Sequence, residues 1–265
     1  MAKLQTIKRG GSRYYVDPES RVKYPGVTSI LDMEPKPFLP PWYAKQAAEW
    51  VADNAGSVVQ LLISGQRTAA VDMIKNAARR FVAEAAETGT AVHDMFEKRA
   101  LGQPIGRVHP ELAEYLRHID AFLDKYQPRF LHVEDAVWSD THQYAGSFDW
   151  IAEVDGEIVM GDTKSTRSGI HDTVAYQLSA YANADKIVTQ AGDAAPMPAI
   201  TAHAVFHVRP EGWKLVPTSA DPAVFAGFLD LRRVFHRVAE DPPRVIGDPL
   251  HDSAASTGAT RRKSK

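Results

Sequence analysis

The chain of 265 residues contains no cysteine. That absence excludes disulfide bonds, thiolate zinc sites and iron–sulfur clusters. The chain also lacks any apolar run approaching the roughly 20 residues of a membrane span. Its first residues, 1–11, lack the apolar core of a signal peptide. We therefore expect a cytoplasmic protein with no membrane partner.

Neither sign of charge dominates the sequence. It has 31 basic and 33 acidic residues, for a formal net charge of -2. This balance argues against a surface that is basic all over, as in a nucleic-acid coat protein, but it allows a local basic track around an acidic site. The hydrophobic fraction of 44% and the charged fraction of 24% are ordinary for a globular protein.

Residues 1–88 are expected to form an N-terminal hairpin and helical region. The predicted elements are a hairpin over 14–24 with its turn at 17–20, a short helix over 27–31 capped near Thr28 or Ser29, a proline-rich connection over 35–41, and two or three helices over 42–87 broken near Gly56 and Gly65.

Residues 89–245 are expected to form an α/β core, in which helices flank a mixed sheet in the α+β manner. Asp155-Gly156 is the strongest hairpin turn signal in the chain. The predicted elements are helices over 90–101, 110–126, 172–189 and 221–240, and strands over 131–139, 144–154, 157–164, 200–208 and 213–216. A basic tail over 246–265 is expected to be disordered.

Two short acidic motifs in the second half of the chain carry the most information. Gly146-Ser147-Phe148-Asp149 places Asp149 in the middle of one expected strand, and Gly161-Asp162-Thr163-Lys164 places Asp162 near the end of the next. The hairpin turn between these strands makes them antiparallel, so the two carboxylates are expected near each other at one end of the sheet. Strand alternation puts Asp162 and Lys164 on the same face.

Two carboxylates and an ammonium group that emerge from a buried strand are costly unless the charges are paired or a cation is bound. Oxygen ligands of this kind select Mg²⁺ or Mn²⁺, which would activate a water and stabilise charge on a pentacoordinate phosphate. Lys164 would orient or deprotonate that water, or stabilise the phosphorane. Taken alone, an Asp-x-Lys pair is more often a surface ion pair, and that alternative stays open.

Flanking polar residues occur on two expected helices. His93 and Glu97 share a helix face, and a neutral imidazole there is a candidate metal ligand. Gln177 and Tyr181 are four apart on the helix after the Asp-x-Lys strand, and they could hold the metal shell or a DNA phosphate. For each pair the alternative is an ordinary polar helix face.

Taken in order, His93, Asp149, Asp162-Thr163-Lys164 and Gln177-x-x-x-Tyr181 resemble the PD-(D/E)XK nuclease superfamily, specifically its RecB-type branch. The resemblance covers about residues 86–210. Residues 24–31 also resemble the start of standalone, often phage-encoded, RecB-like exonucleases related to the CRISPR-associated ones. Many of these exonucleases use four cysteines for an iron–sulfur cluster, so this chain resembles the cluster-free members.

The resemblance implies a restriction-endonuclease-like core, DNA as substrate and phosphodiester hydrolysis with two metal ions. It also implies that the carbonyl of Thr163 binds metal. The chain has no helicase motif of the Gly-x-x-x-x-Gly-Lys-Ser/Thr kind, so an unwinding motor would be a separate partner chain.

Basic and aromatic residues in the N-terminal region are candidates for DNA contact. Lys75, Arg79 and Arg80 are expected on one helix, where they form either a phosphate track or a solvated face. Some N-terminal aromatic residues could stack on unpaired bases, although burial at helix junctions is their commoner role. These are Tyr14, Tyr15, Trp42 and Tyr43.

From these patterns we expect a metal-dependent DNA exonuclease that acts in recombination, repair or end processing, with DNA and a recombination or helicase chain as partners. The first alternative is a structure-selective endonuclease that uses the same chemistry. The second is a non-catalytic DNA-binding or assembly subunit, although such a platform has no need of an intact acid–acid–lysine set.

Overall fold

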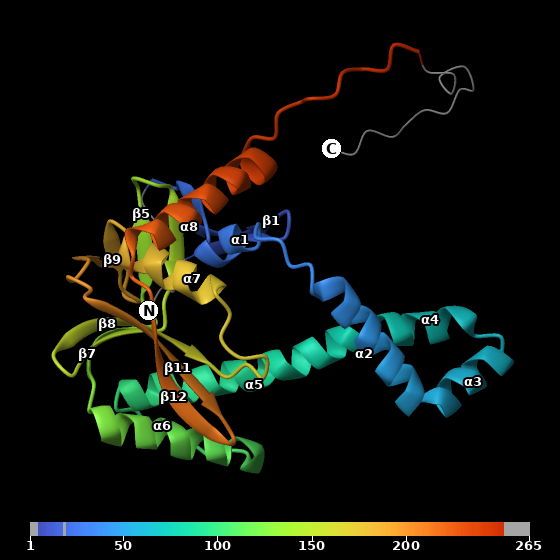
Figure 1. Ribbon diagram of the computed structural model, residues 1–265, viewed down its shortest axis with the longest axis horizontal. Helices are drawn as coiled ribbons and strands as arrows, with labels where there is room; N and C mark the ends of the chain where they lie inside the picture. The colour runs from blue at the N-terminus through green and yellow to red at the C-terminus, as the bar shows by residue number, and fades with distance from the viewer. Residues whose placement is uncertain (1–4, 18–19, 252–265) are drawn as a thin grey trace.

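The fold is mixed α/β, as the sequence predicts, and is built on a five-stranded sheet with helices on both faces (Figure 1). The computed structural model describes residues 5–17 and 20–251. The strand order is β12-β11-β8-β7-β4, in which β8 and β11 are parallel and the other neighbours are antiparallel. The strands are β4 (Arg129–Val133), β7 (Trp150–Val154), β8 (Glu157–Lys164), β11 (Ala202–Arg209) and β12 (Gly212–Thr218).

Each face of this sheet has its own apolar core. Trp150 packs with Phe96 and Phe122 on the face covered by α5 (Ala77–Ala100) and α6 (Ala113–Tyr126). The next residue, Ile151, points to the other face. The helices over that second face are α1 (Val27–Leu31), α7 (Thr173–Ala182) and α8 (Pro222–Phe235). The short helices η1 (Pro110–Leu112) and η2 (His236–Glu240) precede α6 and follow α8.

A second, four-stranded sheet has the order β10-β9-β5-β6. The predicted helix over 172–189 is too long, because α7 ends at Ala182 and residues 186–188 form a strand of this sheet, β9. The strands of this sheet are β5 (Ala136–Ser139), β6 (Tyr144–Ser147), β9 (Lys186–Val188) and β10 (Ala194–Pro196).

The strands predicted over 131–139 and 144–154 are each broken in two, and the halves belong to different sheets. One break lies at Glu134 and Asp135, where Glu134 has a φ of 53°. The other lies at Phe148 and Asp149. The Glu134 amide donates to the Asp149 carbonyl at 2.8 Å, and the Phe148 amide donates to the Asp135 carbonyl at 3.1 Å. The chain therefore passes from one sheet to the other at two adjacent, hydrogen-bonded points.

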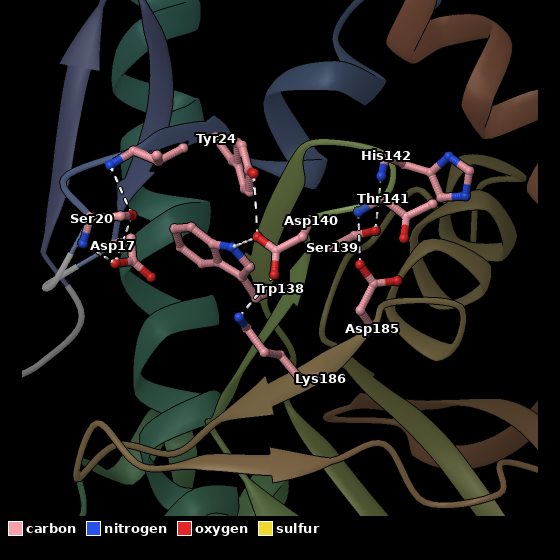
Figure 2. Close-up of polar contacts among 11 residues, drawn as sticks. Asp17, Ser20, Tyr24, Trp138, Ser139, Asp140, Thr141, His142, Asp185 and Lys186 are labelled. Carbon is pink, nitrogen blue, oxygen red and sulfur yellow. Dashed lines mark hydrogen bonds and ion pairs between the residues drawn. The ribbon is translucent and has the colours of Figure 1, made fainter.

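The N-terminal hairpin is confirmed by the antiparallel pairing of β2 (Ser12–Val16) with β3 (Lys23–Pro25), and β1 (Thr6–Arg9) adds a third strand that the sequence did not predict. The hairpin lies against the second sheet, where Asp140 accepts hydrogen bonds from Trp138, Tyr24 and Lys186 (Figure 2). The hydrogen bond from Lys186 lowers the pKa of Asp140, so this joint is ionic at neutral pH.

The predicted short helix over 27–31 is confirmed as α1, but its cap is not Thr28 or Ser29. Gly26 holds the N-cap position without a side-chain hydrogen bond. The Ser29 hydroxyl instead accepts the Arg13 amide at 2.8 Å, and so it links α1 to the hairpin.

Four consecutive helices build an arm that projects from the core in Figure 1. The arm consists of α2 (Leu39–Asp53), α3 (Ala55–Ile63), α4 (Arg67–Lys75) and the first part of α5. Helix α2 begins inside the predicted proline-rich connection, because prolines are tolerated in a first helical turn. The predicted breaks near Gly56 and Gly65 are both confirmed, the first at Asn54 and the second over 64–66.

Helix α5 starts at Ala77 rather than at Thr90, so the predicted domain boundary between residues 88 and 89 falls inside a continuous helix. Of the predicted tail, residues 246–251 contain no helix or strand, and 252–265 lie outside the described residues. Within the described part of the chain, no helix has both the length and the apolar character needed to cross a membrane.

Candidate active site

Asp149 and β8 meet at the point where the chain changes sheets. The Thr163 amide donates a 2.6 Å hydrogen bond to Oδ2 of Asp149. Asp149 lies in the break between β6 and β7, which corrects its predicted position in the middle of a strand. Thr163 belongs to the Asp162-Thr163-Lys164 motif, so its hydrogen bond to Asp149 confirms the predicted proximity of the two acidic motifs.

Asp162 is a nearly inaccessible carboxylate, with 2% of its surface exposed. Its Oδ1 atom accepts hydrogen bonds from Nζ of Lys164 at 2.8 Å and from Nε2 of Gln177 at 3.1 Å. Its Oδ2 atom is buried and has no hydrogen-bond partner among the described residues. A buried carboxylate oxygen without a hydrogen-bond partner costs free energy, and a ligand bound at this position would remove that cost.

The charges of the site are strongly coupled. Burial and the nearby Asp149 carboxylate raise the pKa of Asp162 to about 6, even though Lys164 and His93 oppose the shift. Burial tends to lower the pKa of Lys164, but the carboxylates of Asp162 and Asp149 outweigh it and raise that pKa overall. Lys164 is therefore an ammonium at neutral pH.

Three ligand-type side chains, one of them Asp149 itself, gather at this point. His93 Nδ1 lies 3.4 Å from Asp149 Oδ2. Glu134 completes the group, and one ligand atom from each of these three residues lies within 4.8 Å of the others. His93 comes from α5, Glu134 from the break after β4 and Asp149 from the break after β6, so the broken strands create the cluster. Asp162 lies outside this three-residue group.

Helix α7 covers the site, as the spacing from Lys164 to Gln177 predicts. Gln177 donates from its amide both to Asp162 and to the Tyr181 hydroxyl, the latter at 3.2 Å. Burial raises the pKa of Tyr181 well above its ordinary value, so its phenol stays neutral. A Cβ atom on Gly146 would lie 2.7 Å from the Tyr181 ring, so this glycine allows α7 to approach β6.

The predicted basic stripe does not reach the site and is not continuous. Lys75 is the last residue of α4, and Arg79 and Arg80 lie in the first turn of α5. Lys75 is 3.6 Å from Asp72, and Arg80 stacks over Trp50. Arg79 precedes His93 by 14 residues on α5, which corresponds to about 21 Å along the helix.

Glu134 is the residue at the site that the sequence analysis missed. A signal was present, because Glu134-Asp135 interrupts an apolar run between Val133 and Ala136. Two adjacent acids cannot continue a buried strand without a partner or a break. His132 satisfies one of them, since its Nδ1 lies 2.8 Å from Oδ2 of Asp135.

Comparison with protein-family models and with curated protein sequences found no match to this chain.

Proposed function

We propose that the protein is a metal-dependent deoxyribonuclease, acting as an exonuclease, with a restriction-endonuclease-like PD-(D/E)XK core. The observation that carries the proposal is the convergence of Asp149, Asp162 and Lys164, with one Asp162 oxygen buried and unpaired. A merely structural Asp–Lys pair has no use for a second carboxylate or for an unsatisfied oxygen.

The donor atoms suit Mg²⁺ or Mn²⁺. His93, Glu134 and Asp149 offer one nitrogen and two carboxylate ligands within a small space, and Asp162 offers a further oxygen. In our proposal two ions bind, and the Thr163 carbonyl contributes to one of them. Such ions supply an activated water and compensate the charge that develops on phosphorus.

The chain's own residues would position these groups. The Thr163 amide fixes the Asp149 carboxylate, and Gln177 fixes both Asp162 and the neutral phenol of Tyr181. The Thr163–Asp149 and Gln177–Asp162 contacts each join two different elements, so these carboxylates are held before substrate arrives. Pre-organisation of this kind lowers the cost of reaching the transition state.

Lys164 is assigned to charge stabilisation rather than to proton abstraction. Its raised pKa keeps it protonated, and its ammonium group lies 2.8 Å from Asp162 with its side chain half-buried. In phosphodiester hydrolysis the oxygen of water forms a bond to phosphorus while the bond to the leaving sugar oxygen breaks. A fixed ammonium at this position would stabilise the negative charge that accumulates on the phosphate oxygens.

The test uses end-labelled linear DNA and covalently closed circular DNA, each with Mg²⁺, Mn²⁺ or EDTA. We expect degradation of the linear substrate with either metal, no degradation in EDTA, and an intact circle. The matched controls are Asp162→Asn, which should abolish cleavage, and Asp155→Asn, which changes an exposed turn residue of the same type and should not.

Cleavage of the circle would favour the structure-selective endonuclease over the exonuclease. Absence of cleavage with every metal, together with tight DNA binding, would replace the enzyme with a DNA-binding or assembly subunit. Equal activity of Asp162→Asn and the wild-type protein would refute the assignment of this site.

A further inference from the structure

The helical arm displays aromatic side chains to solvent. Phe38 is 56% exposed, and Tyr43 and Phe81 are each 45% exposed. The Trp42 ring packs against both Tyr43 and Phe81, with centroid distances of 5.1 Å and 5.8 Å. Large aromatic rings that gather at the surface, rather than in a core, mark a binding surface more often than single exposed apolar residues do.

These rings form a row that leads toward the candidate site. Phe38 and Trp42 are four residues apart, so they lie on the same side of α2. At the other end of the row, the Phe38 ring lies parallel to the imidazole of His171, with 6° between the planes and 6.3 Å between the centroids. His171 lines a pocket together with Lys164 and Gln177.

Helix α5 gives the row a second connection to the site. It carries Phe81 in the arm and His93 in the metal-ligand cluster, 12 residues apart, which is about 18 Å along one rigid helix. The aromatic surface and the candidate site are therefore held at a distance that a few nucleotides of one strand can span.

Cations accompany the aromatic rings. Arg79 and Arg80 immediately precede Phe81, and both are exposed. Arg80 is held by a 3.0 Å hydrogen bond to the Met73 carbonyl and stacks over Trp50 with 5.0 Å between the guanidinium carbon and the ring centroid. Arginine beside stacked aromatic rings is the combination that binds unpaired nucleic acid, since the bases stack on the rings and the phosphates pair with the guanidinium groups.

We propose that this row, from His171 and Phe38 through Trp42, Tyr43 and Phe81 to Arg80, binds an unpaired DNA strand and leads it to the candidate site. The proposal rests on the proposed nuclease function and adds a preference for DNA with a single-stranded end. A double helix keeps the faces of its bases covered, so it cannot use the exposed rings.

The experiment measures the binding of fluorescein-labelled oligothymidylate to the full chain in EDTA, with a blunt DNA hairpin, closed by a non-nucleotide linker so that every base is paired, as the double-stranded comparison. Tyr43→Leu and Phe81→Leu keep an apolar side chain but remove the aromatic ring. We expect each to weaken oligothymidylate binding by about tenfold and to leave hairpin binding unchanged. Phe81→Trp should retain the binding.

Ile63→Ala is the matched control, because Ile63 is apolar and 77% exposed on α3 but lies outside the aromatic row. It should bind oligothymidylate like the wild-type protein. Phe38→Leu, at the start of α2, provides an independent variant if a substitution at Phe81 disturbs the packing of the arm. Thermal unfolding of each variant shows whether the fold is retained.

Leucine variants that bind oligothymidylate as tightly as the wild-type protein would overturn the proposal, as would equal losses on oligothymidylate and the hairpin. If Phe81→Leu instead dissociates an oligomer and leaves DNA binding unchanged, the row is a protein contact, and the proposal is also overturned. Because the assay contains no metal, it separates the two proposals. Ring-dependent binding in EDTA, combined with no cleavage in the separate assay with Mg²⁺ or Mn²⁺, would keep the strand-binding row and reject the nuclease, and the converse result would do the opposite.

Discussion

The amide of Thr163 donates to the carboxylate of Asp149, so a strand of the main sheet directly fixes a side chain from the link between the two sheets. This single contact joins the two acidic motifs. Because side chains alternate along a strand, Asp162 and Lys164, on either side of Thr163, point together to the face of β8 that α7 covers.

Substitution of Asp162 should change the pH dependence of stability. The folded-state pKa of Asp162 is raised from 3.8 to about 6, so between those values the folded metal-free protein holds a proton that the unfolded chain has lost. Stability from this group is therefore lost as pH rises through that window. Asp162→Asn should flatten this slope and stabilise the metal-free protein at pH 7 by on the order of 2 kcal/mol.

Urea unfolding of the metal-free protein across this pH range measures the effect. Asp155→Asn, in an exposed turn, is the control and should keep the wild-type slope. Identical slopes for the wild-type protein and Asp162→Asn would show that burial of this carboxylate carries no cost.

Removal of Lys164 should affect turnover rather than metal binding. We expect Lys164→Ala to lower the single-turnover cleavage rate by about 10²–10⁴-fold, the scale for the loss of a positioned charge. Mn²⁺ affinity should stay the same or rise, because an ammonium beside a dication is repulsive. Lys164→Arg should not restore activity, since the guanidinium group is larger and planar.

Because carboxylates raise the pKa of Lys164, the wild-type rate should show no increase from deprotonation of this lysine between neutral pH and its ordinary pKa of 10.5. Lys186→Ala is the matched control, as Lys186 forms an ion pair with Asp140 away from the site. It should cost less than about 1 kcal/mol of stability and leave cleavage unchanged. Near wild-type turnover in Lys164→Ala would contradict the role of this lysine.

Glu134 should be needed for metal binding. Glu134→Gln keeps the size of the side chain but removes a charge from the cluster with His93 and Asp149. We expect Mn²⁺ binding, measured by calorimetry without DNA, to weaken by at least about tenfold. Glu157→Gln, an exposed change at the start of β8, should bind Mn²⁺ normally. Unchanged binding in Glu134→Gln would remove this residue from the ligand set.

Glycine at position 161 should be essential for stability. A Cβ atom there would lie 2.1 Å from the Trp150 ring, which is fully buried. Gly161→Ala should therefore destabilise the protein by about 1–3 kcal/mol or more, the usual cost of overpacking. Gly56→Ala is the opposite control, because its Cβ would meet no atom within 4 Å and alanine favours the helix. Equal denaturation midpoints for the two variants would show that Gly161 is not needed to make room for the Trp150 ring.

Local patterns in the sequence were sufficient to place the two acidic motifs side by side. The β7–β8 hairpin was predicted because Asp155-Gly156 is a turn signal that acts over two residues, and both of these residues have positive φ. Gln177 also lies where the helical spacing predicts. These features depend on contacts between residues close in the chain, which periodicity and turn chemistry record well.

The acidic pair Glu134-Asp135 signals a possible break, but local patterns do not show that the strands on either side of Glu134 and of Asp149 join different sheets. Each break interrupts a run with strand-like residues on both sides, and the reason for the break is that the two halves join different sheets. That choice depends on distant partners, such as the pairing of Val137 with Ile187. The early start of α5 was missed because Gly89 suggested a boundary, whereas in the fold Gly89 lies inside the continuous helix Ala77–Ala100.

The parallel pairing of β8 with β11 has a consequence for the order of folding. The β7–β8 hairpin closes through a two-residue turn, but Ala202 must find Val159, 43 residues earlier, before the sheet is complete. Contacts of long sequence separation form late because loop closure costs entropy. We therefore expect Asp149 and Asp162 to come together early, during synthesis, while α7 docks over them only after β11 has left the ribosome.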